Sequence, residues 1–138
     1  LEMIADPSAS GTYDFSWEGG GVLELSTAPI IRAVVQDVQT GVSPALISAR
    51  FHHTLVVLFD SVCRHLRRCT GIDRVALSGG VFQNSRLLTG LSVALADSGF
   101  DLISHRLVPT NDGGLSLGQA VVAAAQADRM SKTIHHDR

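Results

Sequence analysis

The strongest constraint on the fold is the alternation of short apolar runs and amphipathic stretches in the second half of the chain. The pattern predicts strands over 74–77 and 100–106, which are followed by helices over 85–98 and 114–127 respectively. A strand–helix–strand unit with a right-handed crossover makes its two strands parallel neighbours. The loops after the two strands therefore lie at the same edge of the sheet, where open α/β sheets bind their ligands.

The first of these loops contains a glycine pair between a buried strand and a helix. It reads Ser78-Gly79-Gly80-Val81-Phe82-Gln83-Asn84. Because glycine lacks a Cβ atom, a phosphate or nucleotide can approach Gly79 and Gly80 closely, and the following helix directs free amides at it. The spacing matches neither the Walker A motif nor the dinucleotide fingerprint. From the residues alone, a tight turn with Asn84 as the helix N-cap is an equal alternative.

In the second loop an acid stands beside another glycine pair. The loop reads Pro109-Thr110-Asn111-Asp112-Gly113-Gly114. Asp112 precedes a helix, where a carboxylate accepts hydrogen bonds from free amides and is favoured by the helix dipole. This capping role needs no ligand, and the residues alone favour it slightly. The alternative is that Asp112 is a metal ligand or the acid of a phosphate site.

A long helix is predicted from Pro44, after the N-cap Ser43, to a stop near Gly71. Its apolar stripe comprises Ile47, Phe51, Leu55, Leu58, Val62 and Leu66. The opposite, solvated face carries Arg50, His53, Asp60, Arg64, Arg67 and Arg68. His52 lies on the flank of the stripe, where it either faces a cleft or bonds a backbone carbonyl, and the second role is favoured.

The rest of the chain predicts smaller elements. An N-terminal hairpin pairs strands over 13–17 and 22–26, and a helix follows over 27–41. Residues 1–130 are expected to form one α/β lobe, followed by a polar, frayed tail over 131–138. No HxxxH or CxxC pair occurs in the sequence, so the chain cannot complete a metal site alone.

Composition and charge exclude several kinds of partner. The chain has 138 residues and a net charge of -2, so it lacks the basic excess that binding the phosphates of nucleic acid requires. No uninterrupted apolar run approaches the roughly 20 residues of a membrane span. The N-terminus has neither the basic nor the apolar region of a signal peptide. We therefore expect a cytoplasmic protein with no nucleic-acid or membrane partner.

Three segments in combination point to a known family. They are Arg50-Phe51-His52-His53-Thr54-Leu55, the first loop with its strand over 75–84, and the second loop with its helix over 108–120. These segments closely resemble the C-terminal end of the HypF family, the carbamoyltransferases of nickel–iron hydrogenase maturation. The likeness covers nearly the whole chain, and the motifs SGGVFQN and P-x-NDGG-x-x-x-GQA are specific when they occur together.

The resemblance implies an α/β fold, the second lobe of an actin/Hsp70/sugar-kinase-like (ribonuclease H-like) fold. The lobe would have an N-terminal hairpin followed by strand–helix–strand–helix. The resemblance also implies a carbamoyltransferase that uses carbamoyl phosphate and ATP, with Mg²⁺, to form a carbamoyl-adenylate. The carbamoyl group would pass to the C-terminal cysteine of HypE and later become a cyanide ligand of the hydrogenase iron.

Family likeness also assigns roles to residues of the two loops. The nucleotide would be bound by Ser78, Gly79, Gly80, Gln83, Asn84, Gly113 and Gly114. Asp112 would be one ligand of a zinc or iron ion between two lobes. The resemblance assigns no catalytic residue in this chain.

HypF proteins are much longer, and the histidine pair that supplies their other metal ligands lies in the first lobe, outside this sequence. We therefore expect a fragment that is inactive alone and has the rest of the enzyme and HypE as partners. A homo-oligomer that covers the exposed lobe face is a further expectation.

Two alternatives stay open. One is a lobe of a related tRNA threonylcarbamoyl-transferase or O-carbamoyltransferase, and the other is a non-catalytic interaction module of the same fold. The low basic content favours the HypF family over the tRNA enzymes.

Overall fold

The computed structural model describes residues 1–19 and 22–134 and divides into two compact units. Unit 1 comprises Leu1–Ala76 and Asn84–Ile103, and unit 2 comprises Leu77–Gln83 and Ser104–Arg138. The range 1–130, which the sequence predicts to be one lobe, contributes to both units. The assignment of that range to a single lobe stays a prediction.

The N-terminal hairpin is present, but its first strand begins later than predicted. β1 (Ser16–Gly19) pairs with β2 (Leu23–Ser26) in antiparallel fashion. Tyr13, predicted to begin the first strand, is buried: its N–H donates to Thr54 Oγ1 at 2.8 Å, and its hydroxyl donates to Asp37 at 2.8 Å. Because these bonds lead to helices rather than to a strand, pairing starts only at β1.

Two helices follow the hairpin within unit 1. They are α1 (Ala28–Gln39) and α2 (Pro44–Thr70). The N-cap of α2 is Ser43, whose hydroxyl accepts a hydrogen bond from Leu46 N–H at 3.3 Å. The helix ends at Gly71, which has the left-handed φ of 73° that favours glycine. The predicted start and stop of this helix are confirmed.

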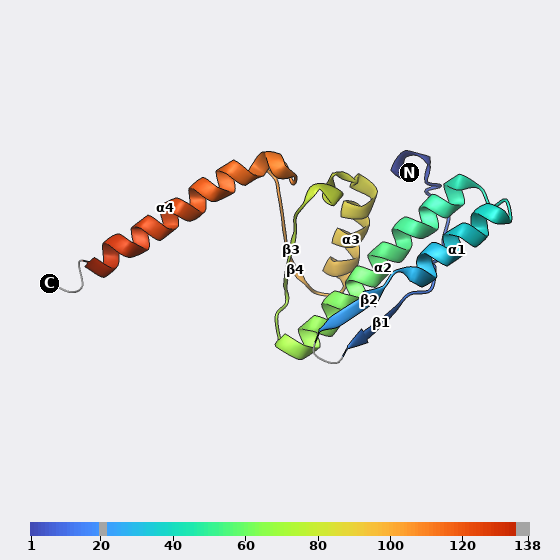
Figure 1. The fold of residues 1–138 in the computed structure, drawn as a ribbon, viewed down its shortest axis with the longest axis horizontal. Coiled ribbons are helices and arrows are strands. Elements are labelled where there is room, and N and C mark those ends of the chain that lie inside the picture. The colour runs from blue at the N-terminus through green and yellow to red at the C-terminus, as the bar shows by residue number, and fades with distance from the viewer. Residues whose placement is uncertain (20–21, 135–138) are drawn as a thin grey trace. The chain divides into compact units, whose positions relative to one another are not determined.

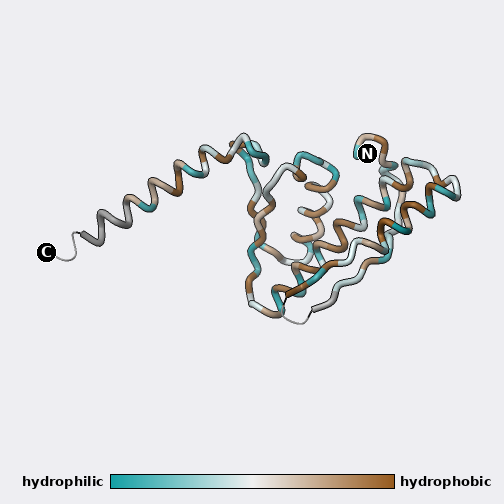
Figure 2. Tube along the Cα trace, viewed as in Figure 1, coloured by the Kyte–Doolittle hydropathy of each residue, from teal (hydrophilic) through white to brown (hydrophobic). Residues whose placement is uncertain are grey.

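The third helix, α3 (Ser85–Asp97), packs along α2 and completes the core of unit 1 (Figure 1). Its buried residues are Leu87, Leu91 and Leu95. Gly90 allows the two helices to approach closely, since a Cβ atom there would lie 3.0 Å from Val56 Cγ2. Apolar residues recur along both helices (Figure 2), as a shared helix–helix core requires.

Two side chains cap the start of α3. The Asn84 side chain accepts a hydrogen bond from Leu87 N–H at 2.9 Å. The Glu2 carboxylate, which lies in the N-terminal 3-10 turn η1 (Glu2–Ile4), accepts from Ser85 Oγ and, at 3.0 Å, from Arg86 N–H. These hydrogen bonds lower the pKa of Glu2, because they favour its ionised form.

α2 is buried on more than one side, which a single apolar stripe does not predict. It packs against α1, α3 and η1. Asp60, predicted to face solvent, is only 5% exposed and accepts hydrogen bonds from Arg64 and from Ser98 Oγ. Leu66, predicted to belong to the stripe, is 46% exposed. Neighbours on several sides therefore bury polar residues that the periodicity places in solvent.

Within the described chain, α2 is also the one helix that is long and apolar enough to cross a membrane, by length and composition alone. In this structure 44% of its most apolar 18-residue window is buried. Its burial against α1 and α3 is that of a core helix. The absence of a membrane partner stays a prediction.

A two-stranded sheet follows, formed by β3 (Arg74–Leu77) and β4 (Asp101–Ser104). At its beginning, the first residue of β4 donates its N–H to the carbonyl of Asp73, just before β3, at 2.9 Å. At its far end, the residues that follow the two strands, Ser78 and His105, are hydrogen-bonded to each other. The strands therefore run parallel, as the strand–helix–strand pattern predicts.

Unit 2 contains two 3-10 turns and the last helix. η2 (Gly80–Gln83) follows β3, while η3 (Asp112–Gly114) leads directly into α4 (Leu115–Ile134). The helix predicted over 114–127 thus continues into the expected polar tail, since no glycine or proline follows Gly118 in the sequence. The rest of that tail lies outside the described residues. Among the side chains of α4 that the structure describes, the large apolar ones more than half exposed are Leu115, Leu117, Val121 and Val122.

Candidate functional site

The two loops that follow β3 and β4 lie against each other in unit 2. The N–H of Gly79 donates to the carbonyl of Thr110 at 2.9 Å. A Cβ atom on Gly80 would lie 3.9 Å from Asn111 Cβ. Parallel strands place their carboxyl ends at one edge of a sheet, and this placement brings together the two motifs that the sequence singles out.

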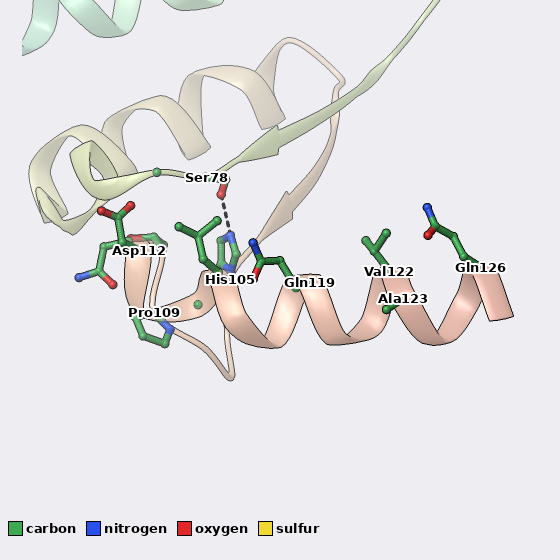
Figure 3. Close-up of a pocket in the computed structure, with 14 residues that line it drawn as sticks. Ser78, His105, Pro109, Asp112, Gln119, Val122, Ala123 and Gln126 are labelled. Carbon is green, nitrogen blue, oxygen red and sulfur yellow. Dashed lines mark hydrogen bonds between the residues drawn. The ribbon is translucent and has the colours of Figure 1, made fainter.

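The two loops and α4 line a single cavity of about 620 Å³ in unit 2 (Figure 3). Its lining residues from the two loops and the strand ends are Ser78, Gly79, His105, Pro109, Thr110, Asn111, Asp112 and Gly114. The first residues of α4 and one side of that helix, including Gln119, Val122 and Gln126, complete the lining. A cavity of this volume is within the range that small-molecule ligands occupy.

The glycines of the loops have local structural reasons to be glycine. Gly79 has φ of 103°, a backbone conformation that other residues rarely adopt. A Cβ atom on Gly114 would lie 2.9 Å from the carbonyl oxygen of Pro109, and one on Gly113 would lie 3.1 Å from Asn111 Oδ1. The fold of the second loop thus requires glycine at position 114 whether or not a phosphate binds there, whereas a Cβ atom at position 113 would need only a small shift of the Asn111 side chain.

Asp112 lines the cavity without capping a helix, so the capping role that its sequence position suggests is wrong. The cap is its neighbour Asn111, whose side chain accepts a hydrogen bond from Gly113 N–H at 3.1 Å. The described residues offer the exposed Asp112 carboxylate neither a hydrogen bond nor an ion pair. The carboxylate is therefore available to a ligand.

The described residues contain no group of three or more His, Cys, Asp or Glu side chains that could hold a metal ion. Asp112 by itself offers carboxylate oxygens, which suit Mg²⁺ or serve as one ligand of a zinc or iron ion. The described part of this chain thus fits a metal site only as the donor of a single ligand, and the metal role of Asp112 stays a prediction.

One residue that lines the cavity, His105, is not predicted from the sequence. Its Nε2 atom lies 2.8 Å from Ser78 Oγ, and both side chains are exposed (Figure 3). Each residue immediately follows a strand, so the parallel pairing of β3 and β4 sets the two side by side. A polar residue directly after each of two adjacent parallel strands is the signal that could have identified the pair.

Asn84 and His52 belong to unit 1, where they bond each other. Asn84 caps α3 with its side-chain oxygen and donates its amide to His52 Nε2 at 2.9 Å. His52 is 4% exposed, and its Nδ1 lies 2.8 Å from the carbonyl of Ser48, which only accepts. In this arrangement Nδ1 donates to the Ser48 carbonyl and Nε2 accepts from the Asn84 amide. The favoured bond from this histidine to a backbone carbonyl is present, and so is the N-cap at Asn84.

Two roles expected from these positions stay predictions. His52 contributes to the lining of a second cavity, of about 520 Å³, between α2 and α3 in unit 1. Of the other residues expected to bind the nucleotide, Ser78, Gly79 and Gly114 line the unit 2 cavity. Gly80, Gln83 and Gly113 are not among its lining residues. The nucleotide contacts expected of these residues and of Asn84 therefore stay predictions.

Comparison with known proteins shows which family this chain matches. Residues 1–119 match the family described as "Carbamoyltransferase, Kae1-like Domain, second subdomain". The chain is 38% identical over 109 residues to the carbamoyltransferase HypF of Rhodobacter capsulatus, which covers 79% of this chain and 14% of that protein. It is also 32% identical over 119 residues to a tRNA N6-adenosine threonylcarbamoyltransferase of Verminephrobacter eiseniae, which covers 86% of this chain and 33% of that protein.

A solved structure agrees with the sequence matches. The crystal structure of full-length HypF in a phosphate- and nucleotide-bound form superposes with a TM-score of 0.83 at 38% identity. The superposition covers 88% of this chain and 16% of that chain. The fold expected from the sequence is thus confirmed, and the chain spans only a small part of the length of these relatives.

Proposed function

The chain belongs to the second subdomain of the Kae1-like carbamoyltransferase domain, and from this premise we propose that its unit 2 cavity binds the phosphates of ATP. The observation that carries the proposal is that Gly79 and Asp112, from loops after adjacent parallel strands, line the same cavity. The HypF structure that superposes on this chain is described as phosphate- and nucleotide-bound, which supports the same ligand class.

Different atoms of the loops would serve different parts of the ligand. The Gly79 N–H is already bonded to the Thr110 carbonyl, so it holds the two loops together. The N–H groups of Gly80 and Val81 open η2, and the first N–H groups of a helical turn lack acceptors within it. Both residues follow Gly79, which lines the cavity, but they are not themselves among the lining residues. They are the proposed phosphate donors. The Asp112 carboxylate would accept Mg²⁺ or serve as one ligand of a zinc or iron ion shared with another lobe.

The wider reaction is proposed from the family. A HypF-type enzyme containing this subdomain would use carbamoyl phosphate and ATP to carbamoylate the C-terminal cysteine of HypE, in the cytoplasm, for hydrogenase maturation. ATP would supply the adenylyl group that activates the carbamoyl group. The proposed task of this chain is to bind and orient the phosphates, with the rest of the enzyme as its partner.

The match to a tRNA threonylcarbamoyltransferase supports a second candidate that would use the same cavity. The net charge of -2 disfavours it, because tRNA binding requires a positive surface. Both candidates predict nucleotide binding, whereas a non-catalytic interaction module of the same fold predicts none.

Calorimetry with ATP and Mg²⁺ on the chain and on Gly79→Ala tests the proposal. The substitution forces a side chain into φ of 103°, and we expect ATP binding to weaken about tenfold or more as the loop shifts. Gly41→Ala is the matched control, since Gly41 also has a positive φ and open space around its Cβ position but lies in unit 1. Equal ATP affinity in both variants, or no ATP binding by the unmodified chain, would contradict the proposal.

A further inference from the structure

The charge of the unit 2 cavity is unusual for a site that would hold a polyanion. Among the residues described as its lining, His105 is the one side chain able to carry a positive charge, and Asp112 is the one carboxylate. The lining that the structure describes contains no lysine or arginine. Within that described lining, a phosphate would meet one side chain able to carry a positive charge.

Among the described lining residues, one charged group besides His105 faces the cavity. Asp112 faces the cavity from η3, and the residues from the β3 loop and from α4 that line it are uncharged. Arg106 follows His105 in the chain but is not part of the lining. No carboxylate bonds His105 within the described residues, so a Ser–His–Asp arrangement is absent from that part of the chain.

The contact with Ser78 couples the histidine's proton to the direction of a hydroxyl. When the imidazole is neutral at Nε2, the Ser78 hydroxyl donates to it across the 2.8 Å contact. When Nε2 carries a proton, that N–H donates to Ser78 Oγ instead, and the hydroxyl hydrogen is free to point into the cavity. Protonation thus supplies both a positive charge and an additional donor.

We propose that His105, oriented by Ser78, is the residue of this cavity that contacts the phosphate, and that it takes up one proton from solvent when the phosphate binds. The inference rests on the proposed function for the cavity. The ligand class is a phosphate ester or a free phosphate chain, because both bring negative oxygens that accept hydrogen bonds from an imidazolium and a hydroxyl. The phosphate itself is unchanged, so no further reactant is needed.

The test is calorimetry of ATP and of inorganic triphosphate binding, in two buffers that differ in ionisation enthalpy, between pH 5.5 and 8.5. The difference between the buffers gives the number of protons taken up. We expect uptake of up to about one proton and tighter binding at the acidic end. His105→Gln should abolish the uptake and weaken binding at acidic pH by roughly 10- to 100-fold, the loss expected for one hydrogen bond to a charged group.

Further variants separate this role from a structural one. His105→Lys keeps a positive charge at every pH, so it should bind both ligands with no proton uptake. Ser78→Ala should weaken binding while leaving the uptake. His53→Gln, which changes an exposed histidine of unit 1, should change neither.

The outcomes distinguish the two proposals. ATP binding without proton uptake, and unchanged in His105→Gln, would overturn the role of His105 and leave the proposed function standing. Triphosphate binding that depends on His105, with no binding of ATP, would overturn the proposed function and support the role of His105. Binding of neither ligand would overturn both.

Discussion

Units 1 and 2 use their polar residues in opposite ways. In unit 1 the buried polar side chains have hydrogen-bond partners within the fold: Asp60 accepts from Ser98 Oγ, and His52 lies between the Ser48 carbonyl and the Asn84 amide. In unit 2, Asp112 and His105 are exposed around a cavity. A buried polar group without a hydrogen-bond partner destabilises the fold, whereas an exposed polar group is solvated by water and can bind a ligand instead. The contrast separates residues that hold the fold from residues free to bind.

The largest effect on stability is expected from a substitution in the core of unit 1. Leu95 in unit 1 is 0% exposed, whereas Leu107 in unit 2 is 98% exposed. Leu95→Ala should lower the free energy of unfolding by about 2–5 kcal/mol through lost burial and a cavity. Leu107→Ala should change it by less than about 0.5 kcal/mol. Urea denaturation followed by circular dichroism measures both, and similar losses in the two variants would contradict the division.

A smaller effect compares one histidine from each unit. His52→Ala removes the partner of the Asn84 amide and of the Ser48 carbonyl, and should cost about 1–3 kcal/mol of unfolding free energy. His105→Ala removes an exposed contact with Ser78 and should cost less than about 1 kcal/mol. Thermal unfolding of the two variants ranks them. A greater loss in His105→Ala would mean that the unit 2 pair serves the fold.

The smallest expected effect is on stability at alkaline pH and concerns Tyr13 in unit 1. Burial, and then the hydrogen bond to Asp37, raise the pKa of Tyr13 from 10.0 to about 12. Between these two pKa values the unfolded chain loses the phenolic proton while the folded chain keeps it. The contribution of Tyr13 to the free energy of unfolding is therefore fully present below pH 10 and is lost as pH rises through about 12. Tyr13 is the only tyrosine, so its ultraviolet absorbance reports this titration directly. Tyr13→Phe should remove this alkaline dependence, and a midpoint near 10 in the folded protein would contradict the burial.

Local signals in the sequence were sufficient for much of the fold. Ser43 and Gly71 mark the ends of α2 because capping and left-handed glycines act on their nearest neighbours. The pairing of β3 with β4 follows from chain order and crossover handedness, and this rule alone places Gly79 and Asp112 near each other. The helix ends depend on residues next to them in the chain, and the strand pairing depends on the order of elements along the chain, so both can be predicted from the sequence.

The remainder depends on neighbours that periodicity cannot reveal. Asp60 is buried because Ser98, at the end of α3, reaches it, and no pattern within α2 encodes that contact. The cap of η3 shifts from Asp112 to Asn111 because either residue type can cap and the backbone decides between them. The contact of His105 with Ser78 is not predicted because the two residues lie 27 positions apart in the chain.

The Glu2 cap on α3 has a consequence for the order in which the protein assembles. It joins residues 84 positions apart, from Glu2 to Arg86. Such a contact requires closure of a long loop, whose entropic cost must be met before the bond can contribute. The nearby cap from Asn84 has no such delay. During folding, the Asn84 cap on the first turn of α3 should thus form early, and the Glu2 cap should form only at a late stage.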